Sequence, residues 1–303
     1  MDDKGILIAA RMDKAEAIEL ARGIFDFLRE RGEKVYYETR LSPKFDGYHS
    51  KSIISATNDI IKFIIVIGGD GSVMRVASAV NQENPPPIFG VNIGSIGFLD
   101  ETNEIKVFKD LEKVLQGDYI IEEVSKITAY LIKSNSEKSK LRNALNEVLI
   151  VSSTHSKVLQ VSIKINGVYL NRSYLDGVII CTSTGSTAYN LSAGGAIVFP
   201  TLDVLQITSL NAFGRSGLKP IVVPIDSEIE IKLLRPRLNA KVIIDGRHFY
   251  EQIQPNTRII VTKANSSFRF IRLSKDLDKS YFKRLKKKII GALKVPLQDS
   301  PEE

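Results

Sequence analysis

The sequence has little of what small secreted domains and zinc proteins use for stability. Its 303 residues include one cysteine, Cys181, three scattered histidines and no tryptophan. A single cysteine excludes an internal disulfide and any all-cysteine zinc site. So few histidines also argue against a structural zinc ion.

The sequence also lacks a long apolar run near its start. The first run, residues 5–10, follows an acidic beginning and is far too short for a signal sequence or a membrane span. We therefore expect a cytoplasmic enzyme or binding protein without a membrane partner. Hydrophobic and charged fractions of 43% and 25% are typical of globular proteins, so neither disorder nor a fibrous protein is indicated.

Basic residues outnumber acidic ones, which gives a net charge of +7. Much of the excess lies in residues 283–288, where Phe282, Leu285 and Ile289 recur at helical spacing. This pattern predicts an amphipathic helix that docks by its apolar side and leaves a solvated basic face. No nucleic-acid recognition motif accompanies it, so no nucleic-acid partner is expected.

One stretch combines a strand, a glycine loop and a helix. The apolar run 63–67 leads into Gly68-Gly69-Asp70-Gly71-Ser72, and apolar residues then recur at helical spacing to residue 80. Glycines at this junction let a ligand approach the backbone, and the start of a helix suits phosphate. A carboxylate repels phosphate, so Asp70 is expected there only with a task, such as accepting a proton or holding a metal ion. The alternative is that Asp70 or Ser72 merely caps the helix.

Residues 1–119 are expected to form an α/β domain with a parallel sheet. Apolar strands are predicted at 5–10, 35–37, 63–67 and 88–91. Helices are expected after the first, third and fourth of these strands, and a surface loop or flap over 41–51 between the second and third. The strand at 88–91 leads into a second glycine-rich loop, which runs from Asn92 through Gly94 to Leu99. Ligands gather at the carboxyl ends of parallel strands, so the two loops are expected to face one crevice, unless they are unrelated turns. Phe98 would cover a flat base there or belong to the core.

From about residue 120, strand-like runs follow one another without helices between them. They lie at 127–132, 148–151, 158–165, 168–174, 178–182, 221–223, 229–234, 241–245, 258–262 and 268–273. Asn166-Gly167 between two of them is a strong signal for a tight hairpin. We expect a β-rich domain over 120–274, followed by a C-terminal helix and tail over 275–303.

Three polar clusters fall in this second domain. Asn146-Glu147 directly precedes the apolar run 148–151. Its amide and carboxylate could bind the hydroxyls and nitrogens of a nucleoside, or the pair could simply belong to a loop. A strand after Asp176 leads into five hydroxyl residues around one glycine. These hydroxyls suit the binding of phosphate or ribose, or they form a turn that caps the next helix. They are Thr182, Ser183, Thr184, Ser186 and Thr187. Asp245-Gly246-Arg247 is interpreted as a hairpin turn in preference to a further carboxylate of the site.

These clusters, in this order, resemble the NAD kinase family. The resemblance rests on Gly68-Gly69-Asp70-Gly71, on Asn146-Glu147, on Asp176-Gly177 and above all on Thr184-Gly185-Ser186-Thr187-Ala188-Tyr189. It covers the chain from about residue 60 to 290. It implies an α/β domain followed by a β-sandwich-like domain and a C-terminal helix, with the active site between the domains and subunits paired into dimers or tetramers.

The resemblance also implies a reaction and roles for single residues. The γ-phosphoryl group of ATP, or a phosphoryl group of polyphosphate, would pass to the 2′-hydroxyl of the adenosine ribose of NAD, with Mg²⁺ or Mn²⁺ as divalent ion. Asp70 would be the catalytic base. Asn146 and Thr187 would recognise adenine, Glu147 the ribose, and Asp176 would lie towards the nicotinamide. The residues implied to bind NAD are Asp70, Gly71, Phe98, Asn146, Glu147, Asp176, Thr187, Ala188, Tyr189 and Ser192; those implied to bind ATP are Gly68, Gly69, Gly71, Ser72, Asn92 and Gly94.

Two other interpretations remain open. A kinase of another small molecule or a lipid shares the glycine loop, but it needs a different acceptor pocket. A dinucleotide-binding protein without catalysis keeps the adenine contacts and has no need of Asp70. The presence of both groups in one chain favours the enzyme.

Overall fold

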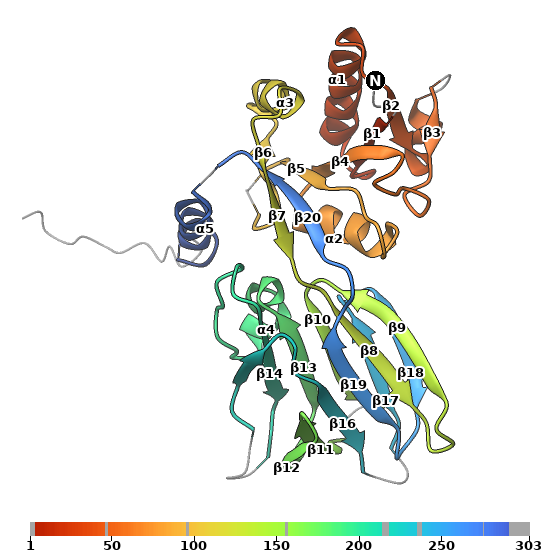
Figure 1. Cartoon of the computed structure of the whole chain (residues 1–303), viewed down its shortest axis with the longest axis vertical. Helices are drawn as coiled ribbons and strands as arrows, with labels where there is room; N and C mark the ends of the chain where they lie inside the picture. Colours follow the sequence, from red (N-terminus) through yellow and green to blue (C-terminus); the bar gives the residue numbers. More distant parts are fainter. Residues whose placement is uncertain are drawn as a thin grey trace, which may run out of the picture. The chain divides into compact units, whose positions relative to one another are not determined.

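The computed structural model describes residues 4–45, 48–94, 97–154, 157–213, 218–234, 238–274 and 276–290. The chain divides into two compact units (Figure 1). The first, the α/β unit, contains the chain up to Glu122 and again from Arg269 onwards. The second, the β unit, is Glu123–Phe268. No helix in the described ranges is long and apolar enough to cross a membrane.

The α/β unit is built on one mostly parallel sheet with the strand order β3-β2-β1-β4-β5-β20-β7, and β6 lies beside β5. The strands are β1 (Gly5–Ala10), β2 (Val35–Glu38), β3 (Ser50–Lys51), β4 (Ile61–Gly68), β5 (Ile88–Asn92), β6 (Thr102–Asn103), β7 (Ile120–Val124) and β20 (Phe268–Arg272). The helices of this unit are α1 (Ala15–Glu30), α2 (Asp70–Ala79), α3 (Val107–Leu115) and α5 (Leu277–Leu285), with a 3-10 helix at Thr39–Lys44.

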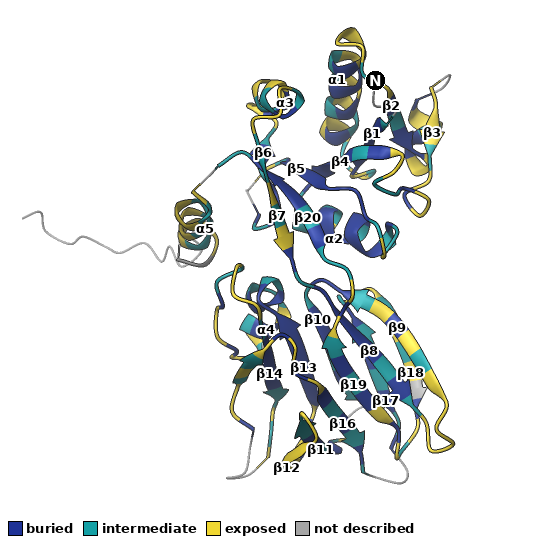
Figure 2. Cartoon of the chain, in the orientation of Figure 1, coloured by how far each residue is buried: buried dark blue, intermediate teal, exposed yellow. Residues whose placement is uncertain are grey.

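The central strands of this sheet are buried throughout. Every residue of β1 and β5 is buried, as the uninterrupted apolar runs predict for strands covered on both faces. Figure 2 shows these strands in the buried colour, whereas α1 turns an exposed side outwards. Helix α1 packs Ala21, Phe25 and Leu28 against the sheet, and the chain leaves it through Gly32 at φ +77°. The expected α/β domain with a parallel sheet is confirmed.

The last strand of the chain differs from the expected domain range 120–274. β20 returns to the first sheet and pairs in parallel with β5, with Phe270 opposite Ile88. Arg272 at its end is buried and ion-paired with Glu101 (3.3 Å) and Glu122 (2.7 Å). The local residue pattern of β20 does not show whether it pairs with a neighbouring strand or with β5, about 180 residues earlier in the chain. The sequence pattern therefore places this strand in the second domain.

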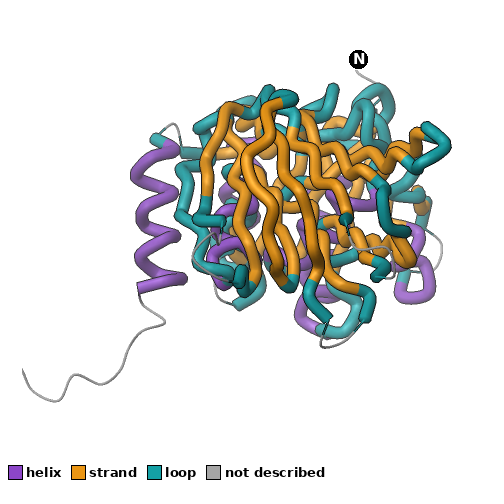
Figure 3. Tube along the Cα trace, turned by 90° about the horizontal axis from the view of Figure 1, so that it is seen from below, coloured by secondary structure: helices purple, strands orange, loops and turns teal. Residues whose placement is uncertain are grey.

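The β unit is a sandwich of two antiparallel sheets with the orders β15-β14-β13-β10-β17-β18 and β12-β11-β16-β19-β8-β9. Its strands are β8 (Ile127–Ile132), β9 (Lys138–Ala144), β10 (Glu147–Ser152), β11 (Leu159–Ile165), β12 (Val168–Leu175), β13 (Gly177–Thr182), β14 (Val204–Leu210), β15 (Ile221–Pro224), β16 (Ile229–Leu233), β17 (Ala240–Ile244), β18 (His248–Ile253) and β19 (Arg258–Lys263). Figure 3 shows strands side by side across this unit. One apolar cluster with members from both sheets forms its core, so the expected β-sandwich is confirmed.

Hairpins of this sandwich turn through residues with positive φ, among them the two whose turns the sequence singles out. Asn166 (φ 50°) and Gly167 (φ 78°) join β11 to β12, as their sequence predicts. Asp245 (φ 50°) and Gly246 (φ 62°) join β17 to β18.

The C-terminal helix forms where it is expected, but its contacts are different. Helix α5 continues into one π-helical turn, Lys286–Ile290, and residues 291–303 of the expected tail lie outside the described ranges. Phe282 is 57% exposed, so it is covered less than the predicted docking of an apolar side requires. Arg284 is a main contact of the helix, because it is largely buried and ion-paired with Glu101.

Candidate active site

The glycine loop has the predicted strand, loop and helix. β4 ends at Gly68, Gly69 is the N-cap, and α2 begins at Asp70. The backbone N–H groups of Ser72 and Val73 donate to the Gly69 carbonyl. The N-cap residue, Gly69, has no side chain that could cap the helix. The alternative that Asp70 does no more than cap the helix does not fit the contacts of its carboxylate with the second glycine-rich loop.

Asp70 is instead tied to the second glycine-rich loop. Its Oδ2 accepts from the Phe98 N–H (3.1 Å) and its Oδ1 from the Leu99 N–H (3.0 Å). Gly97 makes this approach possible, because a Cβ at this position would collide with the Asp70 carboxylate. The two loops that the sequence places after neighbouring strands therefore meet, with a carboxylate as the link.

Asn92 and Asp100 form a buried pair behind this link. The Asn92 amide donates to Asp100 Oδ2 (2.6 Å), so this amide nitrogen, predicted to bind phosphate, faces inwards. Burial raises the pKa of Asp100 to about 6. The Oδ1 atoms of both residues are buried without a hydrogen-bond partner in the structure. Sequence reasoning missed Asp100, because a single aspartate after an apolar residue carries no distinctive signal.

A cation that sequence reasoning also missed lies beside Gly68. Arg11 follows β1, and its N–H donates to the carbonyl of Ile67 (3.0 Å). A Cβ built on Gly68 would lie 3.5 Å from the Arg11 Cβ, so these two segments of the backbone lie against each other. The guanidinium is half-exposed and ion-paired with Asp13 (2.7 Å). A charged residue at the carboxyl end of β1, next to β4 in the sheet, is the signal that would have found it.

The two loops also contain the other residues that the sequence implies to bind ATP, which are Gly69, Gly71, Ser72 and Gly94. Gly71 and Gly94 are exposed, and nothing lies within 4 Å of a Cβ built on either. Gly69 and Ser72 are partly buried. The loops thus combine exposed glycine backbone with a fixed carboxylate.

In the β unit, the Asp245 carboxylate organises the second group of predicted residues. It accepts from the backbone N–H groups of Leu145 (2.9 Å), Asn146 (2.8 Å) and Glu147 (3.1 Å). The interpretation as a hairpin turn is correct, but the carboxylate also holds the Asn146-Glu147 segment. Burial raises the pKa of Asp245, and the three N–H donors offset only part of this rise.

Glu147 lies next to this carboxylate and is itself buried, with 6% of its surface exposed. Burial, and then the charge of Asp245, raise its pKa to about 8. Its Oε2 has no hydrogen-bond partner in the structure. Glu147 therefore carries a proton at neutral pH and offers a carboxylic acid group.

The hydroxyl-rich loop after β13 uses most of its hydroxyls internally. Thr182 donates to the Leu145 carbonyl (2.6 Å), Ser183 to that of Leu202, and Ser186 to that of Val198 (3.1 Å). All three are buried, so their prediction as phosphate or ribose ligands is wrong. Gly185 lies against Asn146, where any Cβ would collide with the Asn146 backbone. The 3-10 turn Thr184–Thr187 is thus packed against Asn146 through Gly185.

The other predicted ligands lie around α4 (Tyr189–Ser192) or far from it. Thr187 and Ala188 are partly buried, whereas Tyr189 and Ser192 are exposed. Asp176 precedes β13 and accepts from the Asn211 amide (2.9 Å). The six residues of β13 put Asp176 roughly 20 Å from the hydroxyl loop. Within one chain the structure does not bring Asp176 together with Asn146 and Thr187.

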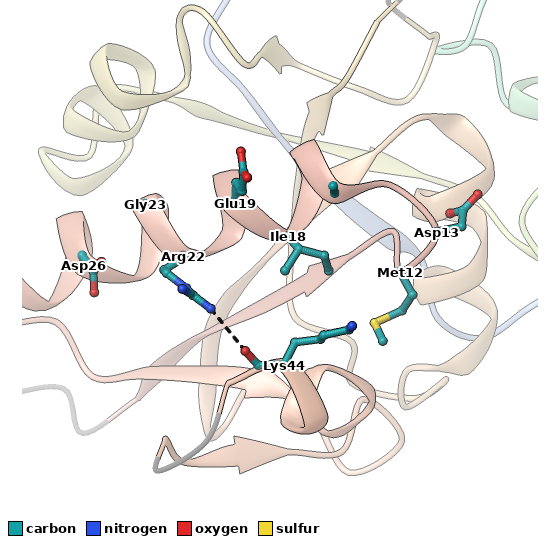
Figure 4. A pocket seen from close by; sticks show the side chains of 9 residues that line it. Met12, Asp13, Ile18, Glu19, Arg22, Gly23, Asp26 and Lys44 are labelled. Carbon is teal, nitrogen blue, oxygen red and sulfur yellow. Dashed lines mark hydrogen bonds between the residues drawn. The ribbon is translucent and has the colours of Figure 1, made fainter.

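The predicted site residues form no metal cluster in the described ranges, and a hollow beside α1 lies apart from them. The described ranges contain no set of three or more His, Cys, Asp or Glu residues placed to hold a metal ion. A hollow of about 640 Å³ lies beside α1 (Figure 4). Both acidic and basic side chains line it, and none of its lining residues is a predicted site residue. Its lining is Met12, Asp13, Ala15, Ile18, Glu19, Arg22, Gly23, Asp26 and Lys44.

Comparison with known proteins agrees with this arrangement. Residues 6–119 match the family model described as the ATP-NAD kinase N-terminal domain, and residues 145–273 match the ATP-NAD kinase C-terminal domain. An NAD kinase of Thermococcus gammatolerans is 35% identical over 281 residues, which are 93% of this chain and 98% of that relative. This chain belongs to the NAD kinase family.

Solved structures of NAD kinase family members have the same fold. A yeast NADH kinase complexed with NADH has a TM-score of 0.84 at 20% identity, covering 100% of this chain and 91% of that one. An NAD kinase from Archaeoglobus fulgidus in complex with ATP has a TM-score of 0.70 at 23% identity, covering 93% and 98%. The N-terminal family model contains the glycine loop, and the C-terminal one contains Asn146, Glu147, the hydroxyl loop and Asp245.

Proposed function

We propose that the protein transfers the γ-phosphoryl group of ATP to the 2′-hydroxyl of the adenosine ribose of NAD and so forms NADP. Family membership supports the reaction. The observation that carries it is the Asp70 carboxylate, which lies at the start of α2 and accepts hydrogen bonds from the Phe98 and Leu99 N–H groups. A rigid carboxylate beside exposed glycines has the placement of a general base for a hydroxyl that attacks a phosphate.

The Oδ1 atom of Asp70 is the proton acceptor in this proposal. It accepts one hydrogen bond, from the Leu99 N–H (3.0 Å), and a carboxylate oxygen has room for a second. The ribose hydroxyl gives its proton to Oδ1 while its oxygen forms the new bond to phosphorus. Catalysis of this kind depends mainly on positioning and on neutralising the phosphate charge. The helix start at Asp70 and the Arg11 side chain supply positive charge.

The Asn146 group is proposed to bind the adenosine of NAD. Asn146 is partly exposed, Gly185 of the hydroxyl-rich loop lies against it, and the backbone around it is fixed by Asp245. Protonated Glu147 both donates and accepts, which suits a ribose hydroxyl. Ala188 and Tyr189 would line the same pocket. Asp176 and Ser192 are the least supported members of the set, because Asp176 lies at the far end of β13 and Ser192 is exposed at the end of α4.

The divalent ion, Mg²⁺ or Mn²⁺, is proposed to arrive with ATP as part of the substrate. Mg²⁺ is usually bound by substrate phosphates with one or two carboxylates and waters, so a protein cage is not required. The residues present fit this use, because Asp70 and the unpartnered oxygens of Asn92 and Asp100 are the hard oxygen ligands that Mg²⁺ prefers. When bound, the ion neutralises charge on the phosphates.

A homo-oligomer, a dimer or a tetramer, in the cytoplasm completes the proposal. Its support is the edge strand β12, where the neighbouring Val168, Tyr169 and Leu170 are all exposed. Apolar side chains exposed together on an edge strand favour association with another copy of the chain. Sedimentation of the purified protein tests this assembly.

Formation of NADP from NAD and Mg²⁺ tests the function. Parallel reactions contain ATP, polyphosphate or no donor, and an NADP-specific dehydrogenase reads the product. Product with a donor and none without it is expected, and the comparison shows which donor serves. If no reaction gives product although calorimetry shows NAD binding, the chain is a non-catalytic dinucleotide-binding protein. If NAD does not bind either, a kinase of another substrate with the same glycine loop becomes the better interpretation.

A further inference from the structure

One face of the C-terminal helix contacts the loop that holds Asp70. Tyr281, Arg284 and Lys288 follow one another at intervals of three and four residues, which places them on the same side of a helix. The Tyr281 ring lies 6.0 Å from the ring of Phe98. All these residues belong to the α/β unit. The C-terminal helix is therefore part of the surroundings of Asp70.

Arg284 anchors this face. Its guanidinium donates to the Phe98 carbonyl (2.9 Å) and to Glu101 (2.8 Å). Only 13% of the Arg284 side chain and 5% of the Glu101 side chain are exposed, so this is a buried ion pair with hydrogen bonds. Such pairs fix geometry, because breaking them leaves an uncompensated buried charge. Phe98 is held through its backbone on both sides, by Asp70 at its N–H and by Arg284 at its carbonyl.

Lys288 extends the contact to the carboxylate itself. Its Nζ lies 2.5 Å from Asp70 Oδ2 and 5.1 Å from the centre of the Phe98 ring. Lys288 lies in the π-helical turn that follows α5, a local geometry that is common at functional sites. The ammonium group and the Phe98 N–H both bond to Oδ2, which leaves Oδ1 with the Leu99 N–H alone.

We propose that Lys288 is a positioning residue for the phosphoryl transfer, and this rests on the proposed function. Its ammonium group holds Oδ2, so that Oδ1 is the oxygen that faces the ribose hydroxyl. It also brings a positive charge to the glycine loop. In the step itself, the 2′-hydroxyl proton passes to Oδ1 and the oxygen–phosphorus bond forms. The bond between the γ-phosphorus and the β–γ bridging oxygen breaks, and ADP leaves.

The test compares Lys288→Met with Lys287→Met in the full chain. Lys287 is exposed on the same helical turn, so its loss removes the same charge from the same segment. We expect Lys288→Met to lower kcat by on the order of 10²-fold and to leave the KM for NAD within about threefold. Lys288→Arg keeps the charge and should recover part of kcat. Lys287→Met should behave as wild type.

A double-mutant cycle with Asp70 separates positioning from a structural role. If Lys288 acts through Asp70, Lys288→Met in an Asp70→Asn background should change the residual rate by less than about threefold. Equal losses in both backgrounds, unchanged kcat in the single variant, or a rise in kcat would each overturn the proposal. A wild-type chain that forms no NADP would instead refute the proposed function. Thermal unfolding of every variant shows that a lost rate is not a lost fold.

Discussion

The backbone N–H of Asn146 donates to the Asp245 carboxylate across 2.8 Å, although the two residues are 99 positions apart. The same carboxylate also accepts from the residues on either side of Asn146. Asp245 thus fixes the segment from which Asn146 and Glu147 present their side chains.

Asp245→Asn should therefore weaken NAD binding without touching the ligand. The new amide has one acceptor oxygen in place of two, so at least one buried N–H loses its partner. We expect a loss of about 1–3 kcal/mol in the free energy of unfolding and a higher Kd for NAD. Denaturant unfolding measures the free energy of unfolding, and calorimetry measures the Kd for NAD. Asp226→Asn, at a residue whose side chain is 79% exposed, is the control. Unchanged NAD binding in Asp245→Asn would contradict this role.

Glu147 should make stability depend on pH. Its pKa is raised to about 8 in the folded protein, above its ordinary value of 4.5, so the folded state holds the proton more tightly than the unfolded state. The resulting stabilisation is complete below pH 4.5 and is lost as the pH rises through 8. We expect wild type to lose on the order of a few kcal/mol relative to Glu147→Gln between pH 5 and 9. Urea unfolding of both proteins across this pH range measures the loss of unfolding free energy. If the two proteins lose the same free energy over this range, Glu147 does not cause the pH dependence.

Gly97→Ala should displace Asp70. A methyl group at this position collides with the carboxylate, which must rotate away from the Phe98 and Leu99 N–H groups. We expect kcat to fall by on the order of 10²-fold. Gly23→Ala is the matched control, because Gly23 lies inside α1 and its Cβ meets only Phe108 at 3.4 Å. That control should keep full activity and gain about 0.5–1 kcal/mol in unfolding free energy. Steady-state kinetics that do not distinguish the two variants would count against a fixed Asp70.

Arg11→Ala should affect the phosphoryl donor alone. Its position beside Gly68 suits a contact to the donor phosphates, and the guanidinium has only to exchange Asp13 for them. We expect the KM for ATP to rise about tenfold while that for NAD stays the same. Arg29→Ala removes an equal charge from an exposed position of α1. Initial rates at varied ATP measure the effect, and equal KM values in the two variants would exclude Arg11 from the donor site.

The sequence was a good guide to structure wherever the signal is local. The run 63–80 contains its own strand, turn and helix, and Asn166-Gly167 determines a two-residue turn by backbone preference alone. Pairing across long separations is not encoded in this way, so β20 was expected in the wrong sheet. β9 was missed because its alternating pattern is rich in lysine and arginine, and only one face of the strand is buried.

For the site, the sequence identifies chemical groups but not their partners. It interpreted the run of five hydroxyls as suited to phosphate or ribose, or as a helix cap, yet Thr182, Ser183 and Ser186 satisfy buried carbonyls of their own fold. It could not show that the Asp245 carboxylate accepts hydrogen bonds from three N–H groups about 100 residues away in the chain. Nor could it show that Lys288 contacts Asp70, which is 218 residues away in the chain. Those relationships exist only once the sheets and the C-terminal helix have formed.

The central claim is that Asp70 takes the proton of the ribose hydroxyl. The most direct measurement is kcat for NADP formation by Asp70→Asn, together with its Kd for NAD from calorimetry and with Asp26→Asn, at an exposed carboxylate of α1, as control. The account predicts that kcat falls by on the order of 10² or more while the Kd for NAD stays within about threefold. Near-normal turnover in Asp70→Asn would contradict it.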